Sequence, residues 1–351
     1  MPINLLKLPR VVGVIVVSEL SDYQEVFLLS LCSYRTKCLV EKASIKAPKL
    51  AFRFGESCGY NEMRIEVITH KQRWLPVTSV LHVYHLVFNK IVTIKLWHDQ
   101  KANTNFDFWR LKGGQLIHRL KCAIEPWTVQ KASQDYINLI FHYSGAYKLN
   151  LSSKREGSLP YINNVQEIEI NHITVDPEFL TNVMTTYPDT QSVSIYSEIV
   201  GDIPNKSPFF QIPNFCVACG RESCGPDYIQ NFFGRNLYLG RASLTEQDLI
   251  QFLQKWISNE AYYNLETMTI FADHGIRLGI LQQAINYVEY DPNEPETRPK
   301  VLIFDIPYLG STPKMYHVRD RNFKEIKRIT DGKRGFLHVD NVRFTFLVQT
   351  N

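Results

Sequence analysis

The chain has 351 residues, of which 44% are hydrophobic and 21% are charged, a balance typical of globular proteins with enough apolar material for one large domain or two to three smaller ones. The formal net charge is only +4 and no dense block of lysine and arginine occurs, so we expect no nucleic-acid partner. The seven cysteines are scattered apart from one cluster, which argues against a disulfide framework and favours a reducing compartment.

An apolar run over residues 11–17 lies close to the N-terminus. It is much shorter than the roughly 20 residues that a membrane-spanning helix needs. Glu19 and Asp22 follow it, and residues 18–21 (Ser-Glu-Leu-Ser) lack the small residues of a signal-peptide cleavage site. We therefore expect a cytoplasmic or nuclear protein with no membrane association.

Helical spacing predicts three short helices in the first 46 residues. Pro9 suits the first turn of a helix, although Gly13 and several valines lower the helix propensity of this segment. The apolar residues of this first helix share one stripe: Val12, Ile15, Val16 and Leu20. Asp22 with Glu25 three residues later resembles a capping box at the start of a second, largely apolar helix. A third helix is expected over residues 35–43.

Three short helices with this much apolar surface cannot be stable alone in water, so something must cover them. Their sequence, from Leu8-Pro9 to the Ser-Tyr-Arg-Thr-Lys of residues 33–37, resembles an F-box, in the form of the family expanded in nematodes. That resemblance implies docking on the Skp-type adaptor of a cullin-RING ubiquitin ligase. The residues that it assigns to this contact are Leu8, Pro9, Val12, Val16, Leu20, Leu28, Leu31 and Cys32. The alternative is an ordinary helical cap packed on the rest of the chain.

Residues 43–49 are polar, contain a proline and are expected to form a hinge. They suggest two domains, a helical module over 1–46 and a larger α/β domain over 47–351. The segments beyond this hinge alternate in polarity or are rich in β-branched residues, which predicts an antiparallel sheet with strands at 49–54, 63–69, 79–88 and 91–97.

Strand and helix patterns then alternate at intervals of roughly 25–30 residues, as in a degenerate leucine-rich-repeat-like βα array. Helices are predicted at 133–145, 176–187 and 243–257, and strands at 146–152, 165–171, 192–197, 235–242 and 265–271. The clearest helix is 243–257, with Thr245 and Asp248 as its cap. The alternative is a conventional α/β layer. Asp331-Gly332 between two alternating runs predicts a C-terminal β-hairpin, with a last strand at 342–348.

Two of these segments also resemble the F-box-associated domain found with this F-box in nematodes. Residues 243–256 followed by 264–270 resemble its signature, although Ile250 stands where asparagine is usual and Gln254 where lysine is usual. Residues 324–348 resemble its closing segment. The resemblance implies a substrate-recognition domain, whereas the prediction for residues 49–160 depends on pattern alone.

A cysteine cluster at 216–224 is the sharpest local motif. Cys216, Cys219 and Cys224 are weak candidates for metal ligands, because a structural zinc site needs four ligands and no second pair is present downstream. A loop with reduced thiols is the alternative. Nearby phenylalanines are expected mostly in the core, with an exposed recognition patch as the other possibility. The proline-rich, charged segment 291–300 is expected to be a solvated, disordered loop.

No phosphate-binding loop, dinucleotide motif or nucleophile elbow occurs, so we expect no cofactor and no catalytic residue. The resemblance implies a non-catalytic substrate receptor that binds an adaptor, and through it a cullin, and holds an unknown protein target. The alternatives are an interaction module that sequesters its partner outside any ligase, and a zinc- or thiol-dependent protein that uses the cysteine cluster.

Overall fold

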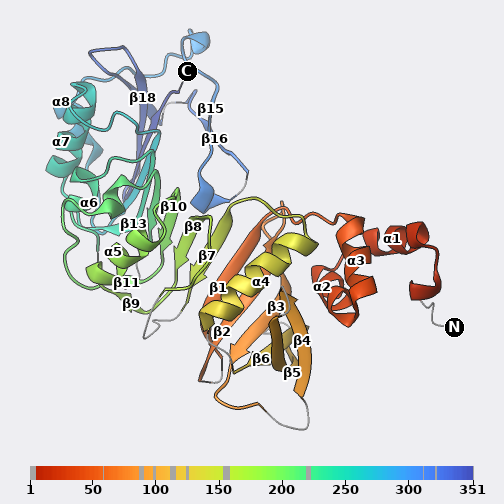
Figure 1. The fold of residues 1–351 in the computed structure, drawn as a ribbon. Coiled ribbons are helices and arrows are strands. Elements are labelled where there is room, and N and C mark those ends of the chain that lie inside the picture. Colours follow the sequence, from red (N-terminus) through yellow and green to blue (C-terminus); the bar gives the residue numbers. More distant parts are fainter. Residues whose placement is uncertain are drawn as a thin grey trace. The chain divides into compact units, whose positions relative to one another are not determined.

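The computed structural model describes residues 5–57, 59–86, 91–97, 100–110, 116–123, 126–152, 159–218, 223–310, 312–320 and 322–350. Residues 6, 91–97, 100–106 and 108–110 are described by their backbone alone. The chain is a mixed α/β protein that divides into two compact units, an N-terminal unit of residues 1–166 and a C-terminal unit of residues 167–351 (Figure 1).

The N-terminal unit begins with three helices and continues into a sheet. Its elements are η1 (Leu5–Lys7), α1 (Arg10–Ser18), α2 (Tyr23–Cys32), α3 (Tyr34–Ala43), β1 (Leu50–Ser57), β2 (Tyr60–Ile68), β3 (Trp74–His82), β4 (Ile91–Trp97), β5 (Gln100–Arg110), β6 (Leu116–Cys122), α4 (Pro126–Ile140) and β7 (Tyr147–Leu151). The helix predicted at 133–145 therefore starts earlier, at Pro126, a residue that suits the first helical turn.

The sheet of this unit runs in the order β7-β1-β2-β3-β6-β5-β4. The prediction that its early strands form one antiparallel sheet is only partly correct. Strands β1, β2 and β3 pair antiparallel, but β6 lies between β3 and the β5-β4 pair and runs parallel to β3. A buried ionic cluster joins β2, β3 and β6, through Glu62, Ser79 and Arg119, and this contact between residues far apart in sequence was not visible in local patterns.

The C-terminal unit alternates strands and helices before ending in hairpins. Its elements are β8 (Val165–Ile170, which starts at the unit boundary), β9 (Thr174–Val175), α5 (Pro177–Thr186), β10 (Ser192–Ile195), β11 (Glu198–Ile199), η3 (Pro208–Gln211), β12 (Asn214–Val217), α6 (Asp227–Gln230), β13 (Asn236–Ala242), α7 (Glu246–Ile257), β14 (Thr267–Ala272), α8 (Leu278–Ala284), η4 (Pro295–Thr297), β15 (Val301–Phe304), η5 (Pro307–Leu309), β16 (Lys314–His317), β17 (Phe323–Lys327), β18 (Arg334–Val339) and β19 (Arg343–Val348).

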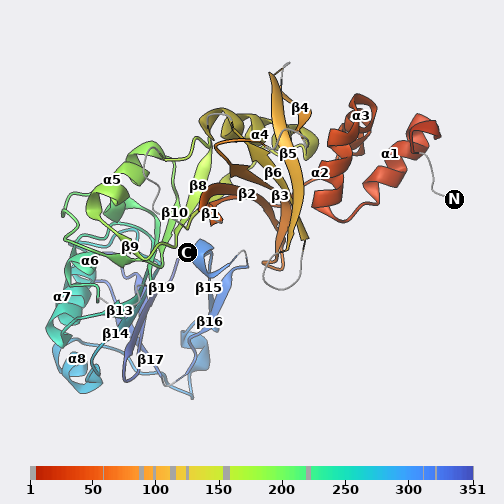
Figure 2. The same ribbon diagram turned by 90° about the horizontal axis from the view of Figure 1, so that it is seen from below.

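Five strands of this unit, β8, β10, β12, β13 and β14, lie side by side in chain order and are all parallel. Strands β19, β18 and β17 extend the sheet antiparallel. Helices α5–α8 cover one face and the β15-β16 hairpin lies over the other (Figures 1 and 2). The predicted cap of α7 is present, since Thr245 and Asp248 exchange hydrogen bonds as a capping box.

Two local predictions for this unit have clear outcomes. The turn between β17 and β18 holds Gly332 at φ 68°, in the left-handed region that favours glycine, as expected for a hairpin at Asp331-Gly332. Of the clustered phenylalanines, four lie in the core and Phe233 is exposed. The buried four are Phe209, Phe210, Phe215 and Phe232.

The prediction of a solvated, disordered loop at 291–300 is only partly correct, because most of these residues are exposed but the segment is ordered. Residues 295–297 form the short helix η4, and the Arg298 side chain is buried next to it. Its guanidinium donates to the carbonyl oxygens of Val288 (2.5 Å) and Phe323 (2.9 Å) and lies 3.4 Å from a Glu325 carboxylate oxygen. These contacts offset the loss of conformational entropy on ordering the segment, a loss that its polar composition alone does not compensate.

Candidate functional site

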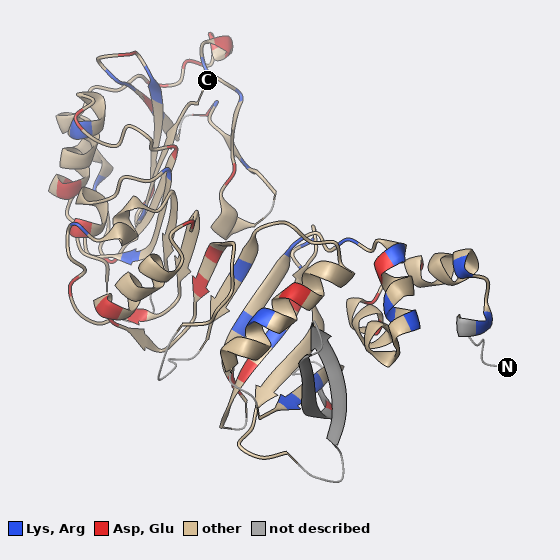
Figure 3. Ribbon diagram, viewed as in Figure 1, with Lys and Arg blue, Asp and Glu red and all other residues tan. Residues whose placement is uncertain are grey.

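The first helix, α1, carries several exposed aliphatic side chains. Its only charged residue is Arg10 at the N-terminal end (Figure 3). Only Gly13 and Val17 are buried. Four other side chains keep a large part of their surface exposed, namely Val11 (71%), Val12 (42%), Ile15 (55%) and Val16 (44%). We call these four residues the α1 apolar face.

Helix α1 is held by α3. A Cβ atom at Gly13 would lie 3.3 Å from Leu39 Cδ2, so the glycine permits a close approach of the two helices. Buried Val17 adds to this contact side. This packing covers Val12 and Val16 in part and leaves Val11 and Ile15 more than half exposed.

Helix α2 is fixed firmly to the sheet and to α4. The Gln24 side chain accepts from His118 N (2.6 Å) and donates to Leu116 O (3.3 Å), both on β6. The buried Phe27 ring packs against His118 and Tyr136, with ring centroids 6.0 Å away in each case. The Tyr136 hydroxyl donates to Ser30 Oγ over 2.9 Å.

Helix α3 completes this attachment. It starts with a capping box in which Ser33 and Thr36 bond each other's backbone N–H groups. Lys37 lies over the ring of Tyr136, and the imidazole of His142 bonds the carbonyl oxygen of Glu41 over 2.6 Å. Helices α2 and α3 are thus built into the N-terminal unit, and they present α1 as its outer layer.

The eight residues predicted to contact an adaptor are all at least partly accessible. Pro9, Val12, Val16 and Cys32 are exposed, and Leu8, Leu20, Leu28 and Leu31 are half-buried. Their contact with a partner stays a prediction. Sequence spacing also included Ile15 in the stripe but missed Val11 and Tyr34, which are exposed too. The signal for Val11 was available, because it lies one helical turn before Ile15.

A hollow of about 310 Å³ lies beside this surface, between η1 with α1 and the start of α3. Leu5, Leu8 and Leu39 supply apolar walls, and Tyr34 and Arg35 line the side formed by α3. The apolar face and this hollow together form a surface that can receive apolar side chains of another protein.

Of the cysteine cluster, two residues can be placed. Cys216 on β12 and Cys224, which bridges to Ala242, are both buried, and Cys219 lies outside the described residues. Within the described ranges, no group of three or more His, Cys, Asp or Glu side chains is arranged to hold a metal ion. Burial separates Cys216 and Cys224 from solvent, which does not favour a thiol that reacts with external substrates.

Buried His118 gives the attachment of α2 a pH dependence. Burial lowers the pKa of His118 to about 4, although Asp107 acts in the opposite direction. The folded chain therefore holds the neutral ring, whereas the unfolded chain binds a proton near pH 6.5. The contribution of His118 to the free energy of unfolding is thus fully present above pH 6.5 and is lost as the pH falls toward 4. We expect urea denaturation to show a loss of about 1 kcal/mol between pH about 7.5 and about 5.5.

The substitution His118→Asn should remove this part of the pH dependence, and the same change at exposed His274 should leave it intact. If the free energy of unfolding depends equally on pH in the two variants, the role of His118 is contradicted.

No known protein-family profile matches this chain, and neither curated proteins nor solved structures give a significant match. Among the residues that the structure describes, no helix is long and apolar enough to cross a membrane.

Proposed function

We propose that this chain is the substrate-receptor subunit of a Skp-cullin-F-box type ubiquitin ligase. The observation that carries the proposal is the α1 apolar face, in which four aliphatic side chains of one short helix are exposed together. Exposed apolar surface of this kind marks protein interfaces, because water contact with it is unfavourable. The resemblance of the same helices to an F-box supports a Skp-type adaptor as the partner.

Helices α2 and α3 support this role mechanically. Their hydrogen bonds and aromatic contacts to β6 and α4 join the helical module to the sheet of the N-terminal unit. A receptor needs such a joint, since it must hold its target at a defined place relative to the ligase. The target's lysines then experience a high effective concentration of ubiquitin-charged conjugating enzyme. In this proposal the chain itself contributes no catalytic residue.

The C-terminal unit would supply the target-binding domain. Its five parallel strands in chain order, with helices on one face, support a degenerate leucine-rich-repeat-like array of the F-box-associated type. Such arrays leave the face opposite the helices available for partners. The target is a protein of unknown identity.

The test is binding of the full chain to a purified Skp-type adaptor. We expect the double variant Val12→Asp/Val16→Asp to bind at least about 100-fold more weakly than the unchanged chain, because two apolar contacts are lost and two carboxylates must be desolvated. Calorimetric titration measures the effect. Both residues lie partly in solvent, at 42% and 44% exposure, so the thermal unfolding temperature should fall less than for a charge placed in the core.

The matched control is Ile173→Asp, which places the same charge on an exposed aliphatic residue of the C-terminal unit. It should bind the adaptor normally. No binding by the unchanged chain would exclude the ligase and leave a sequestering interaction module, and equal binding by both variants would remove the α1 apolar face from the contact.

A further inference from the structure

The face of the C-terminal sheet that points away from the helices is largely polar. Adjacent strands align one row across it, and the members of this row are Ser194, Cys216, Tyr238, Thr269, Thr345 and His338. The alternate positions Phe344 and Phe346 on β19 contact the α7 residues Phe252 and Trp256 and so point to the helix side. Strand alternation therefore assigns Thr345 and Arg343 to the other face.

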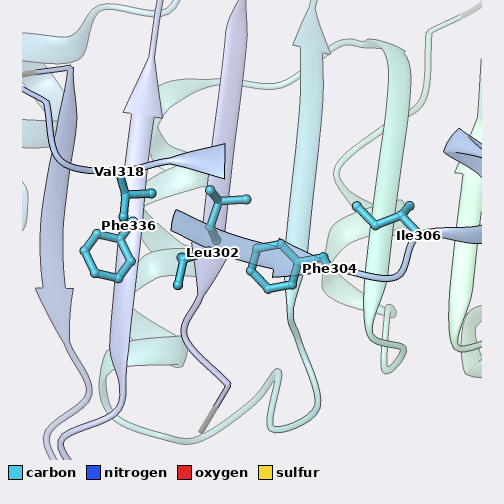
Figure 4. Packing of buried hydrophobic residues seen from close by; sticks show 6 residues of the cluster. Leu302, Phe304, Ile306, Val318 and Phe336 are labelled. Carbon is cyan, nitrogen blue, oxygen red and sulfur yellow. The ribbon is translucent and has the colours of Figure 1, made fainter. Parts of the chain in front are cut away.

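The β15-β16 hairpin covers only part of this face. Leu302, Phe304, Ile306 and Val318 pack on Phe336 and Leu347 of the sheet (Figure 4). Next to this cluster the hairpin and sheet enclose a pocket of about 460 Å³. Its main walls are Tyr238, Phe271, Tyr316, Phe323, His338 and Arg343. The aromatic rings pack in pairs, Tyr238 with Phe271 at 5.8 Å and Phe323 with His338 at 5.3 Å.

Two cationic side chains line the pocket. Arg343 and Lys314 line it against a single carboxylate, Asp320. One oxygen of Asp320 already accepts from the backbone N–H groups of Asn322 (2.7 Å) and Phe323 (3.3 Å). A guanidinium beside aromatic walls can bind a carboxylate while an attached apolar group packs on the rings.

Arg343 has capacity for such a ligand. Its side chain is 42% exposed and lies 3.4 Å from Asp340 Oδ2 through Nε. That Nε atom is buried and makes no hydrogen bond to any residue within the described ranges. The buried Nε therefore faces Asp340, whereas the exposed part of the guanidinium can meet the carboxylate of a ligand.

The neighbouring strand β16 favours a peptide as the ligand. All four of its residues line the pocket, whereas none of β15 does. In the part of the chain that the structure describes, β16 pairs only with β15, so its other edge can accept an extended strand. Main-chain hydrogen bonds along such an edge give affinity, and side-chain pockets beside it give selectivity.

We infer that this pocket binds an extended peptide of a protein partner, with a peptide carboxylate on Arg343 and an adjacent apolar side chain between Tyr238, Phe271 and Tyr316. The carboxylate comes from either a free C-terminus or an internal aspartate or glutamate. The site lies in the C-terminal unit and uses no residue of the α1 apolar face. It therefore stands whether or not the helices bind an adaptor.

The test uses the full chain on two arrays of synthetic ten-residue peptides with randomised sequence. Peptides of the first array end in a free carboxylate and hold no acidic residue, and those of the second are amidated and hold one internal glutamate. Peptides retained from either array are resynthesised with a fluorophore, and their affinity is measured by polarisation. We expect retained peptides to carry an apolar residue beside the carboxylate.

Arg343→Gln should lower the affinity for these peptides at least about 10-fold. Lys314→Glu on the exposed rim should also lower it, with the fold unchanged. The matched control Arg277→Gln removes an exposed, ion-paired arginine outside the pocket and should bind normally. The Val12→Asp/Val16→Asp variant should also bind normally. The array that yields Arg343-dependent peptides identifies the source of the carboxylate. If neither array yields any, the inference is overturned.

Discussion

Replacing Trp256 by alanine is expected to lower the free energy of unfolding of the C-terminal unit by about 3–5 kcal/mol. The indole is fully buried on α7 and packs edge-to-face on Phe346, with ring centroids 4.9 Å apart. The Arg328 guanidinium lies over it, 5.4 Å from the ring centre. Gly335 on β18 lies against the indole, since a Cβ atom there would be only 3.0 Å from it. Glycine has no side chain that could fill the space left by the indole.

Urea denaturation measures this loss, and peptide binding should weaken with it because β18 and β19 carry His338 and Arg343. Trp256→Phe should cost less, since the indole Nε1 is buried without a hydrogen-bond acceptor among the described residues. The control Trp127→Ala removes an exposed indole and should cost less than about 1 kcal/mol. A similar loss at both tryptophans would contradict the packing role of Trp256.

Replacing Glu62 by leucine is expected to destabilise the N-terminal unit by about 3–5 kcal/mol, because it leaves the charge of Arg119 buried without this carboxylate. The side chains of Glu62 and Arg119 are each only 3% exposed and lie 3.1 Å apart. Ser79 donates to the same carboxylate over 2.5 Å, and Arg64 donates over 2.7 Å. Burial alone would raise the pKa of Glu62, but the bonds from Arg64 and Ser79 and the two arginine charges lower it overall.

The double variant Glu62→Leu/Arg119→Met should recover most of the lost stability, since two apolar side chains of similar size can replace a buried ion pair at little cost. A double-mutant cycle followed by urea denaturation gives the coupling between the two residues. If the double variant is as unstable as the two single losses added together, the pair does not act as a unit.

The two proposed contacts can be tested separately because they lie in different units. A change on the α1 apolar face should affect only adaptor binding, and a change at Arg343 should affect only peptide binding. A substrate receptor needs both contacts, whereas a sequestering module needs only the second. The pair of variants therefore distinguishes these functions in one set of measurements.

The sequence determined the elements whose signals are local. The cap at Thr245 and Asp248 set the start of α7, and Asp331-Gly332 set the hairpin between β17 and β18. The helical spacing of the aliphatic residues in α1 also predicted an apolar contact surface. These features arise from hydrogen bonds and side-chain patterns within a few residues, so no distant contact is needed to predict them.

Only the tertiary structure decided which surfaces stay open and which strands become neighbours. The parallel pairing of β3 with β6, the burial of Arg298 in a segment expected to be disordered, and the pocket around Arg343 all join residues far apart in the chain. Their free energy comes from long-range burial and pairing, which depend on how the whole chain packs. Patterns within a short stretch of sequence do not show such contacts, so the peptide pocket could not be predicted from the sequence.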